Sequence, residues 1–439
     1  MKKHFLYFLS FLLLNVSYAQ EENLQISLEE AVNYAIENNR VAKNAALDIE
    51  AAKKQKWETT AIGLPQLNAK IDYQNWLKQQ FDGVDFNQDG VIDFGAKQSI
   101  NATATLSQML FDGSYLVGLQ SAKVFLEISK NAKEKTDLEI RKATINAYSN
   151  VLLAEESLNI YNNNIDVLTK NLNETQEIFN NGLTEEESVE QLQITLKQLE
   201  NGRNNAIRLK DIAYEMLNIT LGTNLNTNVK LTNNLEDLAM KHTDLAILSS
   251  NNNVEDNIDY KIAANDKKSK ELLLKLERSR ALPTLNAFVN GSYIGNSNDF
   301  DFLDREKQWI GTSLFGVSLN VPIFSSGQSG ARKQRAKINL EKAENNLTET
   351  EQKLKFQIDS AKSNYQFAIE KHNTSKENLA LAERIEKKNQ TKYFEGIATS
   401  FELRQAQQQL YSSQQEYLQA MLDVITNKVE LETILNQTK

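Results

Sequence analysis

The chain has 439 residues and no cysteine, which excludes disulfide bonds, thiolate metal sites and a lipid-acceptor cysteine. Acidic residues outnumber Lys and Arg by 58 to 49, and the formal net charge of −9 argues against nucleic acid as a partner. Only three prolines occur, so very long helices can form without interruption. The length by itself predicts two or three domains.

Residues 1–19 have the pattern of a secretory signal peptide. A charged start (Lys2, Lys3, His4) precedes an apolar run at 5–14, and Ser-Tyr-Ala at 17–19 is a small-x-small cleavage site. The alternative is an uncleaved anchor helix, but this run is much shorter than the roughly 20 residues that span a bilayer. No later stretch approaches that length either, so a membrane-spanning part would have to consist of β-strands.

The rest of the sequence contains an internal duplication. Three matches in the same order indicate it: Leu64 to Ala69 with Leu282 to Ala287, Ala147 to Asn150 with Ala361 to Asn364, and Phe179 and Gly182 with Tyr393 and Gly396. We therefore predict a first structural repeat at 20–235 and a second at 236–439. Each repeat is expected to contain a helix, a strand, a long loop, a second strand and two long helices joined by a turn.

The elements of both repeats follow from their patterns. The opening helix begins at Ser27, and Glu30 three residues later predicts a capping box. Its expected packing face comprises Ala31, Tyr34, Ala35, Ala45 and Ala46. The other expected elements are strands at about 67–76 and 98–108, a helical hairpin at about 114–221, strands at about 284–294 and 310–321, and a hairpin at about 328–436.

The four predicted strands alternate apolar and polar residues over nine or ten positions, which is the length and pattern of a transmembrane β-strand. The last strand departs from this alternation at Leu314 and Gly316. A half-buried sheet in a soluble domain has the same period and is the alternative. We favour membrane strands because the neighbouring helices use their apolar faces on each other. Four aromatic residues near the loop ends would form an interfacial girdle: Tyr73, Trp76, Tyr293 and Trp309.

Four membrane strands cannot close a barrel. The smallest membrane barrels have about eight strands, and an open sheet edge in lipid leaves backbone groups without hydrogen bonds. The membrane interpretation therefore predicts that several copies pool their strands.

The long helices carry apolar residues at spacings of three and four. In the first hairpin these include Val151, Ala154, Leu158, Tyr161, Ile165, Leu168 and Leu172, and in the last helix Leu403, Ala406, Leu410, Tyr417, Ala420 and Val424. This pattern predicts antiparallel coiled-coil hairpins. A plain coiled-coil rod is the alternative, but a rod needs neither alternating strands nor a signal peptide.

Signals for a metal site or an active site are weak. Residues 85–93 resemble a calcium-binding loop, but Ala96 stands where a Glu is expected and flanking helices are not predicted, so we favour a polar loop. His242 and His372 are isolated, and we find no nucleophile elbow or phosphate loop. We predict no cofactor and no enzymatic activity.

Over nearly all of the mature chain, the sequence resembles the outer-membrane efflux protein family of the TolC type. The resemblance rests on the paired Leu-Pro-x-Leu elements, the strand-ending Leu-Phe-Asp-Gly and Ile-Phe-Ser-Ser-Gly, and two aromatic-x-x-Gly turns. The turn at 393–407 matches the hairpin-tip signature of the family well, and the one at 179–189 is more degenerate. The resemblance implies a mainly α fold with a small β part, in which three copies share a 12-stranded β-barrel and an α-barrel.

The resemblance also implies roles for residues at the turns. The expected adaptor-contacting positions are Phe179, Gly182, Leu183, Tyr393, Gly396 and Ile397. The adaptor would be a periplasmic membrane fusion protein, with an inner-membrane efflux transporter beyond it.

Acidic rings narrow the periplasmic entrance in this family, and they fall on Glu402 and Gln405, so one ring is acidic and one is neutral. A solvated helix glutamate is the alternative for Glu402. Tyr393 matches the family's polar lock, but Ser188 and Ala398 replace its charged partners, so the gate is expected to be held differently.

The sequence thus predicts a subunit of an outer-membrane channel in a Gram-negative bacterium, with its helical part in the periplasm. It would be a passive exit duct of a tripartite efflux pump or a type I secretion system, embedded in outer-membrane lipid as a homotrimer. The alternative from another class is a periplasmic coiled-coil scaffold without a pore.

Overall fold

The computed structural model describes residues 24–78, 96–249 and 253–436. The expected signal peptide and the candidate calcium loop at 85–93 lie outside the described residues. In chain order the elements are β1 (Leu24–Ile26), α2 (Leu28–Asn38), α3 (Arg40–Ala61), β2 (Gln66–Asn75), β3 (Gln98–Asp112), α4 (Gly113–Asn180), α5 (Glu186–Leu221), β4 (Val229–Leu231), α6 (Leu235–Lys241), η1 (Leu245–Ser249), η2 (Val254–Asp256), α7 (Ile258–Ser279), β5 (Thr284–Ser297), β6 (Ile310–Asn320), α8 (Gln328–Phe394) and α9 (Ser400–Ile434).

The chain forms two compact units, and each draws on both halves of the sequence. The hairpin unit comprises Met1–Ala46, Lys133–Tyr260 and Glu351–Lys439. The sheet unit comprises Leu47–Ala132 and Lys261–Thr350. The four long strands belong to the sheet unit, and both helical turns belong to the hairpin unit.

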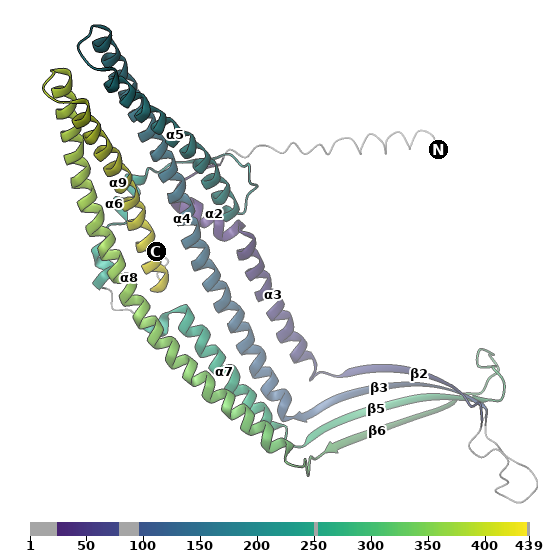
Figure 1. The fold of residues 1–439 in the computed structure, drawn as a ribbon. Helices are drawn as coiled ribbons and strands as arrows, with labels where there is room; N and C mark the ends of the chain where they lie inside the picture. The colour runs from purple at the N-terminus through teal and green to yellow at the C-terminus, as the bar shows by residue number, and fades with distance from the viewer. Residues whose placement is uncertain (1–23, 79–95, 250–252, 437–439) are drawn as a thin grey trace, which may run out of the picture. The chain divides into compact units, whose positions relative to one another are not determined.

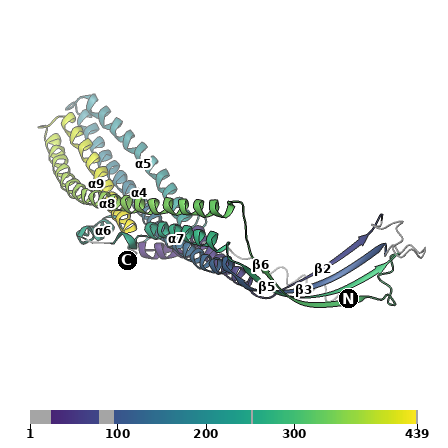
Figure 2. The ribbon, with the colours of Figure 1, turned by 90° about the horizontal axis from the view of Figure 1, so that it is seen from below.

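The sheet unit contains an antiparallel sheet in the order β2-β3-β5-β6 (Figures 1 and 2). In the hairpin unit α4 turns back into α5, and α8 turns back into α9 (Figure 1). The predicted fold class, mainly α with four long strands and two antiparallel helical hairpins in a duplicated chain, is confirmed. Among the described residues, no helix is both long enough and apolar enough to cross a membrane.

The opening helix begins as predicted but is interrupted. Ser27 caps α2, and the Glu30 carboxylate accepts a hydrogen bond from the Ser27 N–H at 2.8 Å, which completes the capping box. Asn39 then leaves the helical conformation, with φ −58° and ψ 135°, and α3 begins at Arg40. The predicted packing face was therefore partly wrong. Ala31 and Ala35 are buried, but Ala46 is exposed and Ala42 is buried, because the break changes the phase of the helix.

The break at Asn39 is a joint between two helix ends, and it occurs in both repeats. The Asn39 side chain donates to the Thr220 carbonyl at the end of α5 at 2.7 Å and accepts from the Val41 N–H at 2.8 Å. In the second repeat Asn257 does the same, donating to Ile434 at the end of α9 at 2.6 Å and accepting from Asp259 at 2.7 Å. We call these contacts the asparagine joints.

The residue that ends each returning helix has a left-handed backbone. Gly222 follows α5 with φ 82°, and Asn436 stands in the corresponding place after α9 with φ 56°. These are the two residue types that adopt this conformation most readily. A side chain on Gly222 would also come within 2.4 Å of the Asn38 carbonyl oxygen, so only glycine lets α5 end against α2.

The core of the hairpin unit lies away from the turns. Tyr148 of α4 is fully buried there, and its hydroxyl donates to the Ile26 carbonyl and to the Asn233 side chain. Tyr365 of α8 is also fully buried, and its hydroxyl donates to the His242 carbonyl. The short strands β1 and β4 pair in parallel beside Tyr148. Each of these strands has three residues, which is too short for an alternation of apolar and polar residues to be recognised in the sequence.

Candidate functional site: the strand sheet and the hairpin turns

The strand register brings the apolar residues of all four long strands onto one face. Leu67, Leu106, Val289 and Phe315 form one cross-strand row. The apolar face comprises Leu67, Ala69, Ile71 and Tyr73 of β2, Ile100, Ala102, Ala104 and Leu106 of β3, Leu285, Ala287, Val289 and Tyr293 of β5, and Phe315, Val317 and Leu319 of β6. Leu67, Ile71 and Phe315 are 72%, 74% and 71% exposed, so the described chain leaves most of this face uncovered.

The opposite face is polar and is tied together by side-chain hydrogen bonds. Asn290 donates to Thr105 at 2.9 Å, and the hydroxyls of Ser292 and Thr312 lie 2.7 Å apart. The register explains the glycine of the last strand, while Leu314 lies on the polar face opposite Asn290. Gly316 lies opposite Phe288, and a side chain on Gly316 would come within 2.6 Å of the Phe288 ring, so the ring fills the space that glycine leaves.

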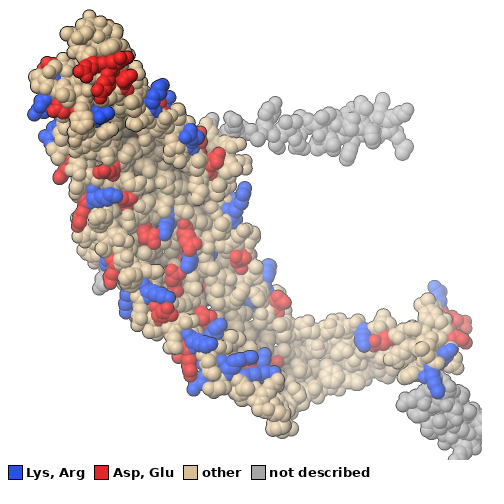
Figure 3. All heavy atoms as spheres, in the orientation of Figure 1, with Lys and Arg blue, Asp and Glu red and all other residues tan. Residues whose placement is uncertain are grey.

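The sheet is almost uncharged. The four long strands contain only Lys70, Asp72 and Asp112 as charged residues, and Lys70 pairs with Asp72 at 2.8 Å. Figure 3 shows this surface nearly free of Lys, Arg, Asp and Glu along most of its length, whereas the helices carry many such residues. β2 and β6 are the two edge strands, and each pairs on one side only among the described residues.

The predicted aromatic girdle is partly a packed cluster. The rings of Tyr73 and Trp309 both contact Phe302, with centroid distances of 6.3 Å. Phe302 comes from the loop between β5 and β6, and alternation could not reveal it. Trp76 and Tyr293 are exposed and do not join this cluster.

Both hairpin turns have the same backbone geometry. Gly182 and Gly396 adopt left-handed φ values of 70° and 72°. The Leu183 N–H donates to the Ile178 carbonyl at 3.0 Å, and the Ile397 N–H donates to the Lys392 carbonyl at 2.9 Å, as in a Schellman motif. Among the predicted tip residues, Leu183 and Ile397 are 78% and 70% exposed, while Phe179 and Tyr393 are half-buried.

Glu402 and Gln405, the predicted constriction residues, both lie exposed in the first turns of α9. The Glu402 carboxylate accepts from the Thr399 N–H at 2.8 Å and from its hydroxyl at 3.0 Å, completing a capping box. These hydrogen bonds lower the pKa of Glu402 below its ordinary value. Glu402 therefore has a defined hydrogen-bonded place at an exposed helix end, which agrees both with a pore constriction and with a solvated helix glutamate. Ordinary capping-box spacing would have predicted it.

Toward the turns, α4 contacts the second hairpin through uncharged polar side chains. Gln390 donates to Asn171 at 2.8 Å, Asn164 donates to Gln414 at 2.8 Å, and the Tyr393 hydroxyl donates to Thr175 at 3.4 Å. Asn164, Asn171 and Thr175 of α4 are buried. We call these three pairs the polar seam. Tyr393 thus has a neutral hydroxyl partner, and the heptad pattern gave no sign of these contacts because it follows apolar positions.

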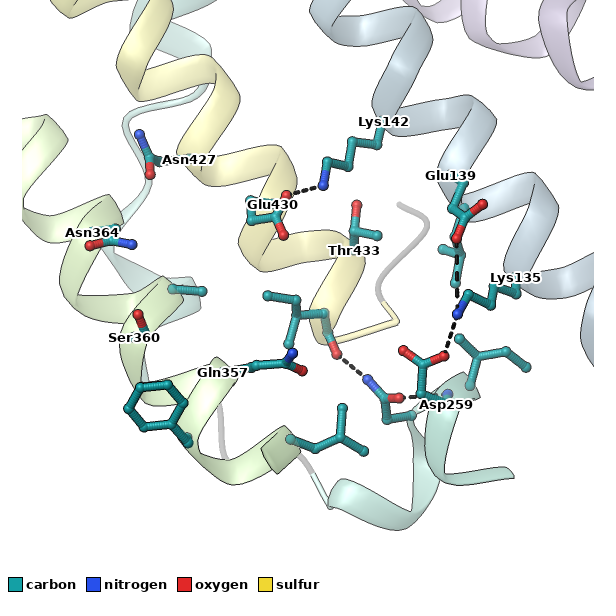
Figure 4. Close-up of a pocket in the computed structure, with 17 residues that line it drawn as sticks. Lys135, Glu139, Lys142, Asp259, Gln357, Ser360, Asn364, Asn427, Glu430 and Thr433 are labelled. Atoms are coloured by element: carbon teal, nitrogen blue, oxygen red, sulfur yellow. Dashed lines mark hydrogen bonds and ion pairs between the residues drawn. The ribbon is translucent and has the colours of Figure 1, made fainter. Parts of the chain in front are cut away.

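At the other end of the hairpin unit, charged side chains line a cleft of about 370 Å³. Lys142 points to Glu430, and Lys135 lies between Glu139 and Asp259, 2.7 Å from the latter carboxylate (Figure 4). The charges in the cleft therefore pair with each other, and they join α4 to α9 and to the start of α7. These ion pairs hold the helices together, and none of the charged side chains shown in Figure 4 is left to bind a ligand.

Of the two described histidines, His372 is buried and His242 is half-buried. Burial lowers the pKa of both, and the His372 ring stacks on Tyr417 at a centroid distance of 5.5 Å. Among the described residues, no group of three or more His, Asp or Glu side chains is placed to hold a metal ion.

The comparisons with known proteins agree with this geometry. The family model described as outer membrane efflux protein matches residues 31–223 and 263–437. A search of curated proteins found no match. The structure is similar to that of CusC, with a TM-score of 0.77, 18% identity, and coverage of 93% of this chain and 91% of that one.

Two other outer-membrane structures show the same fold. The CmeC outer membrane channel of Campylobacter jejuni gives a TM-score of 0.75 at 18% identity, covering 94% of this chain and 87% of that one. The outer membrane protein VceC of Vibrio cholerae gives 0.74 at 14% identity, covering 93% and 96%. Because the family model matches most of this chain, the chain belongs to the outer membrane efflux protein family.

Proposed function

We propose that three copies of this chain form a passive exit duct through the outer membrane, as part of a tripartite efflux pump or a type I secretion system. The observation that carries the proposal is the sheet, which has an exposed apolar face, a polar face, almost no charge and two unpaired edges. An uncovered apolar face of this size in water would be an aggregation site, whereas in lipid it is the expected outer wall of a pore.

The unpaired edges support assembly. Backbone groups of β2 and β6 need partners in lipid, and a second copy can supply them by pairing its β2 with this β6. Three copies would give twelve strands, the number that the family resemblance implies. The polar face, with its Ser, Thr and Asn side chains, then lines the lumen.

The helices offer a second surface for neighbouring copies. Leu209, Ile212, Met216 and Ile219 of α5 recur at spacings of three and four and are all exposed in the single chain. α8 likewise exposes Phe356 and Phe367. Apolar stripes at this spacing are the seams through which helices pack, which supports a helical wall built from several copies in the periplasm.

The turn residues are the proposed adaptor contacts. Leu183 and Ile397 present exposed apolar side chains, and Glu185, Glu186 and Glu187 make the first turn acidic. The proposed partners are a periplasmic membrane fusion protein at these turns and an inner-membrane transporter beyond it. The neutral Gln405 and the acidic Glu402 form the proposed periplasmic constriction.

A matched pair of neighbouring residues on β3 tests the channel. Ala102→Arg places a charge on the apolar face and should prevent membrane assembly, since it costs about 2–4 kcal/mol at the bilayer midplane. Thr103→Arg places the same charge on the polar face, so it should assemble and change ion selectivity. Detergent-extracted trimers and planar-bilayer conductance are the measurements.

A wild-type protein that stays monomeric in detergent, is released from membranes by carbonate and never conducts would favour the periplasmic scaffold instead. Equal assembly of the two arginine variants would contradict the assignment of the faces.

The constriction has its own test, because two variants separate charge from capping. Glu402→Gln keeps the capping acceptor and removes the charge, whereas Thr399→Ala removes the cap and keeps the charge. If the Glu402 carboxylates form a ring, block of the channel by divalent cations should weaken in Glu402→Gln and persist in Thr399→Ala. Unchanged block in Glu402→Gln would rule out the ring.

A further inference from the structure

The loop between β5 and β6, residues 298–309, folds around an aromatic core of its own. Phe302 at its centre is only 4% exposed. Its ring meets Phe300 at 5.6 Å as well as Tyr73 and Trp309, and all three contacts are edge-on or tilted. A side chain on Gly295 would come within 3.3 Å of the Phe302 ring, so this glycine makes room for the loop.

The register shows which face of the sheet the loop covers. Tyr73 lies opposite Ile100, and Ile100 lies opposite Gly295. This row belongs to the same face as Leu67 and Ile71, because successive side chains of a strand alternate between faces. The loop therefore folds over the end of the apolar face and leaves the polar face open.

The outward side of the loop combines apolar and charged groups. Leu303 is 87% exposed and Phe300 is 61% exposed. Lys307 is held inward, with its ammonium 2.9 Å from Asp301 and 5.6 Å from the centre of the Phe302 ring. Arg305 lies exposed, and the exposed acidic residues Asp304 and Glu306 stand on either side of it in the chain. The exposed apolar tips, and not a net positive charge, therefore suit this loop to a membrane–water interface.

We propose that loop 298–309 is a lipid-binding element of the outer leaflet, with Leu303 and Phe300 inserted among the acyl chains. Lipid is the occupant because the patch continues the apolar face, which lies in lipid under the proposed function on which this inference rests. Lys307 and Asp301 are positioning residues that hold Phe302 and thereby the shape of the loop.

Single-cysteine labelling tests the proposal directly, since the chain has no cysteine of its own. Leu303→Cys, Ile71→Cys and Leu183→Cys would each carry a polarity-sensitive fluorophore in vesicles containing brominated phospholipid. We expect brominated lipid to quench the labels at positions 71 and 303, while aqueous iodide quenches only the label at position 183. Leu183 is the matched control because it is similarly exposed and lies at a hairpin turn.

The outcomes separate the two proposals. A label at 71 that lipid fails to quench would overturn the proposed channel. Quenching at 71 with iodide access at 303 would overturn the loop proposal and leave the channel standing. Shielding at 303 from both quenchers would show that protein covers the loop, which also overturns it.

Discussion

The two ends of the hairpin unit hold their helices together by different means. Away from the turns, Tyr148 and Val151 of α4 pack against Met421 and Ile425 of α9 in a buried apolar core. Toward the turns, the polar seam joins the same hairpins through amide and hydroxyl pairs. Both regions contain buried side chains, and they differ in the chemistry of those side chains: apolar in the first region and uncharged polar in the second.

The difference bears on what happens when the helices separate. Apolar side chains gain nothing from water on separation, whereas separated amides recover hydrogen bonds with it. The side-chain NH2 group of Asn171, a member of the seam, has no hydrogen-bond partner among the described residues even in the packed state. Separating the helices at the polar seam should therefore cost less free energy than separating them at the apolar core around Tyr148.

The largest expected effect on stability is in the apolar core around Tyr148. Tyr148→Ala should destabilise the protein by about 3–5 kcal/mol, because it leaves a cavity in the core and removes a hydrogen bond to the Asn233 side chain. Tyr148→Phe keeps the ring and should cost only about 1 kcal/mol. Guanidinium unfolding of the detergent-solubilised protein would measure both, and a loss in Tyr148→Ala as small as that in Tyr148→Phe would refute the contrast between the two ends.

A smaller effect is expected in the polar seam, and it should depend on whether one partner or both are replaced. Asn171→Leu alone should cost about 1 kcal/mol, since it leaves the half-buried Gln390 amide without its acceptor. Asn171→Leu with Gln390→Leu should recover most of that loss, because neither polar group then remains. The same unfolding assay gives the coupling in a double-mutant cycle, and additive losses would show that the two amides act independently.

The smallest effect concerns Glu386, which lies on α8 toward the turn. Burial raises its pKa above the ordinary value, so its charged form opposes folding. The contribution of protonated Glu386 to folding stability is therefore fully present below the pKa that this residue has in the unfolded chain. It is lost as the pH rises through the pKa that Glu386 has in the folded chain. Glu386→Gln should therefore raise the midpoint of guanidinium unfolding at about pH 7 and leave that midpoint unchanged at about pH 4. A gain that is equal at both pH values would point to packing instead of charge.

The sequence predicted the features that local pattern encodes. Alternation located β2, β3, β5 and β6, and the aromatic-x-x-Gly spacing located the left-handed Gly182 and Gly396. The capping box at Ser27 was equally readable, because its two residues are three apart. Each of these signals lies within about ten residues of chain.

The missed features depend on partners that are distant in sequence. Gln390 and Asn171 are 219 residues apart, and nothing near either one identifies the other. Phe288 explains Gly316 only once the strand register is known. The duplication did not reveal which residue of each repeat is the large core side chain: the buried Tyr365 aligns with the buried Val151, whereas Tyr148 aligns with Lys362.

The asparagine joints have a consequence for how such a chain can change over evolution. At each joint the end of a returning helix contacts the start of another segment through a side-chain hydrogen bond: the end of α5 contacts Asn39, just before α3, and the end of α9 contacts Asn257, just before α7. A turn of helix added to both arms of a hairpin would lengthen that hairpin without rotating the segment beyond the joint, whose phase starts afresh at Arg40 or Ile258. Hairpin length can then vary to suit a partner while the register of the strands stays as it is.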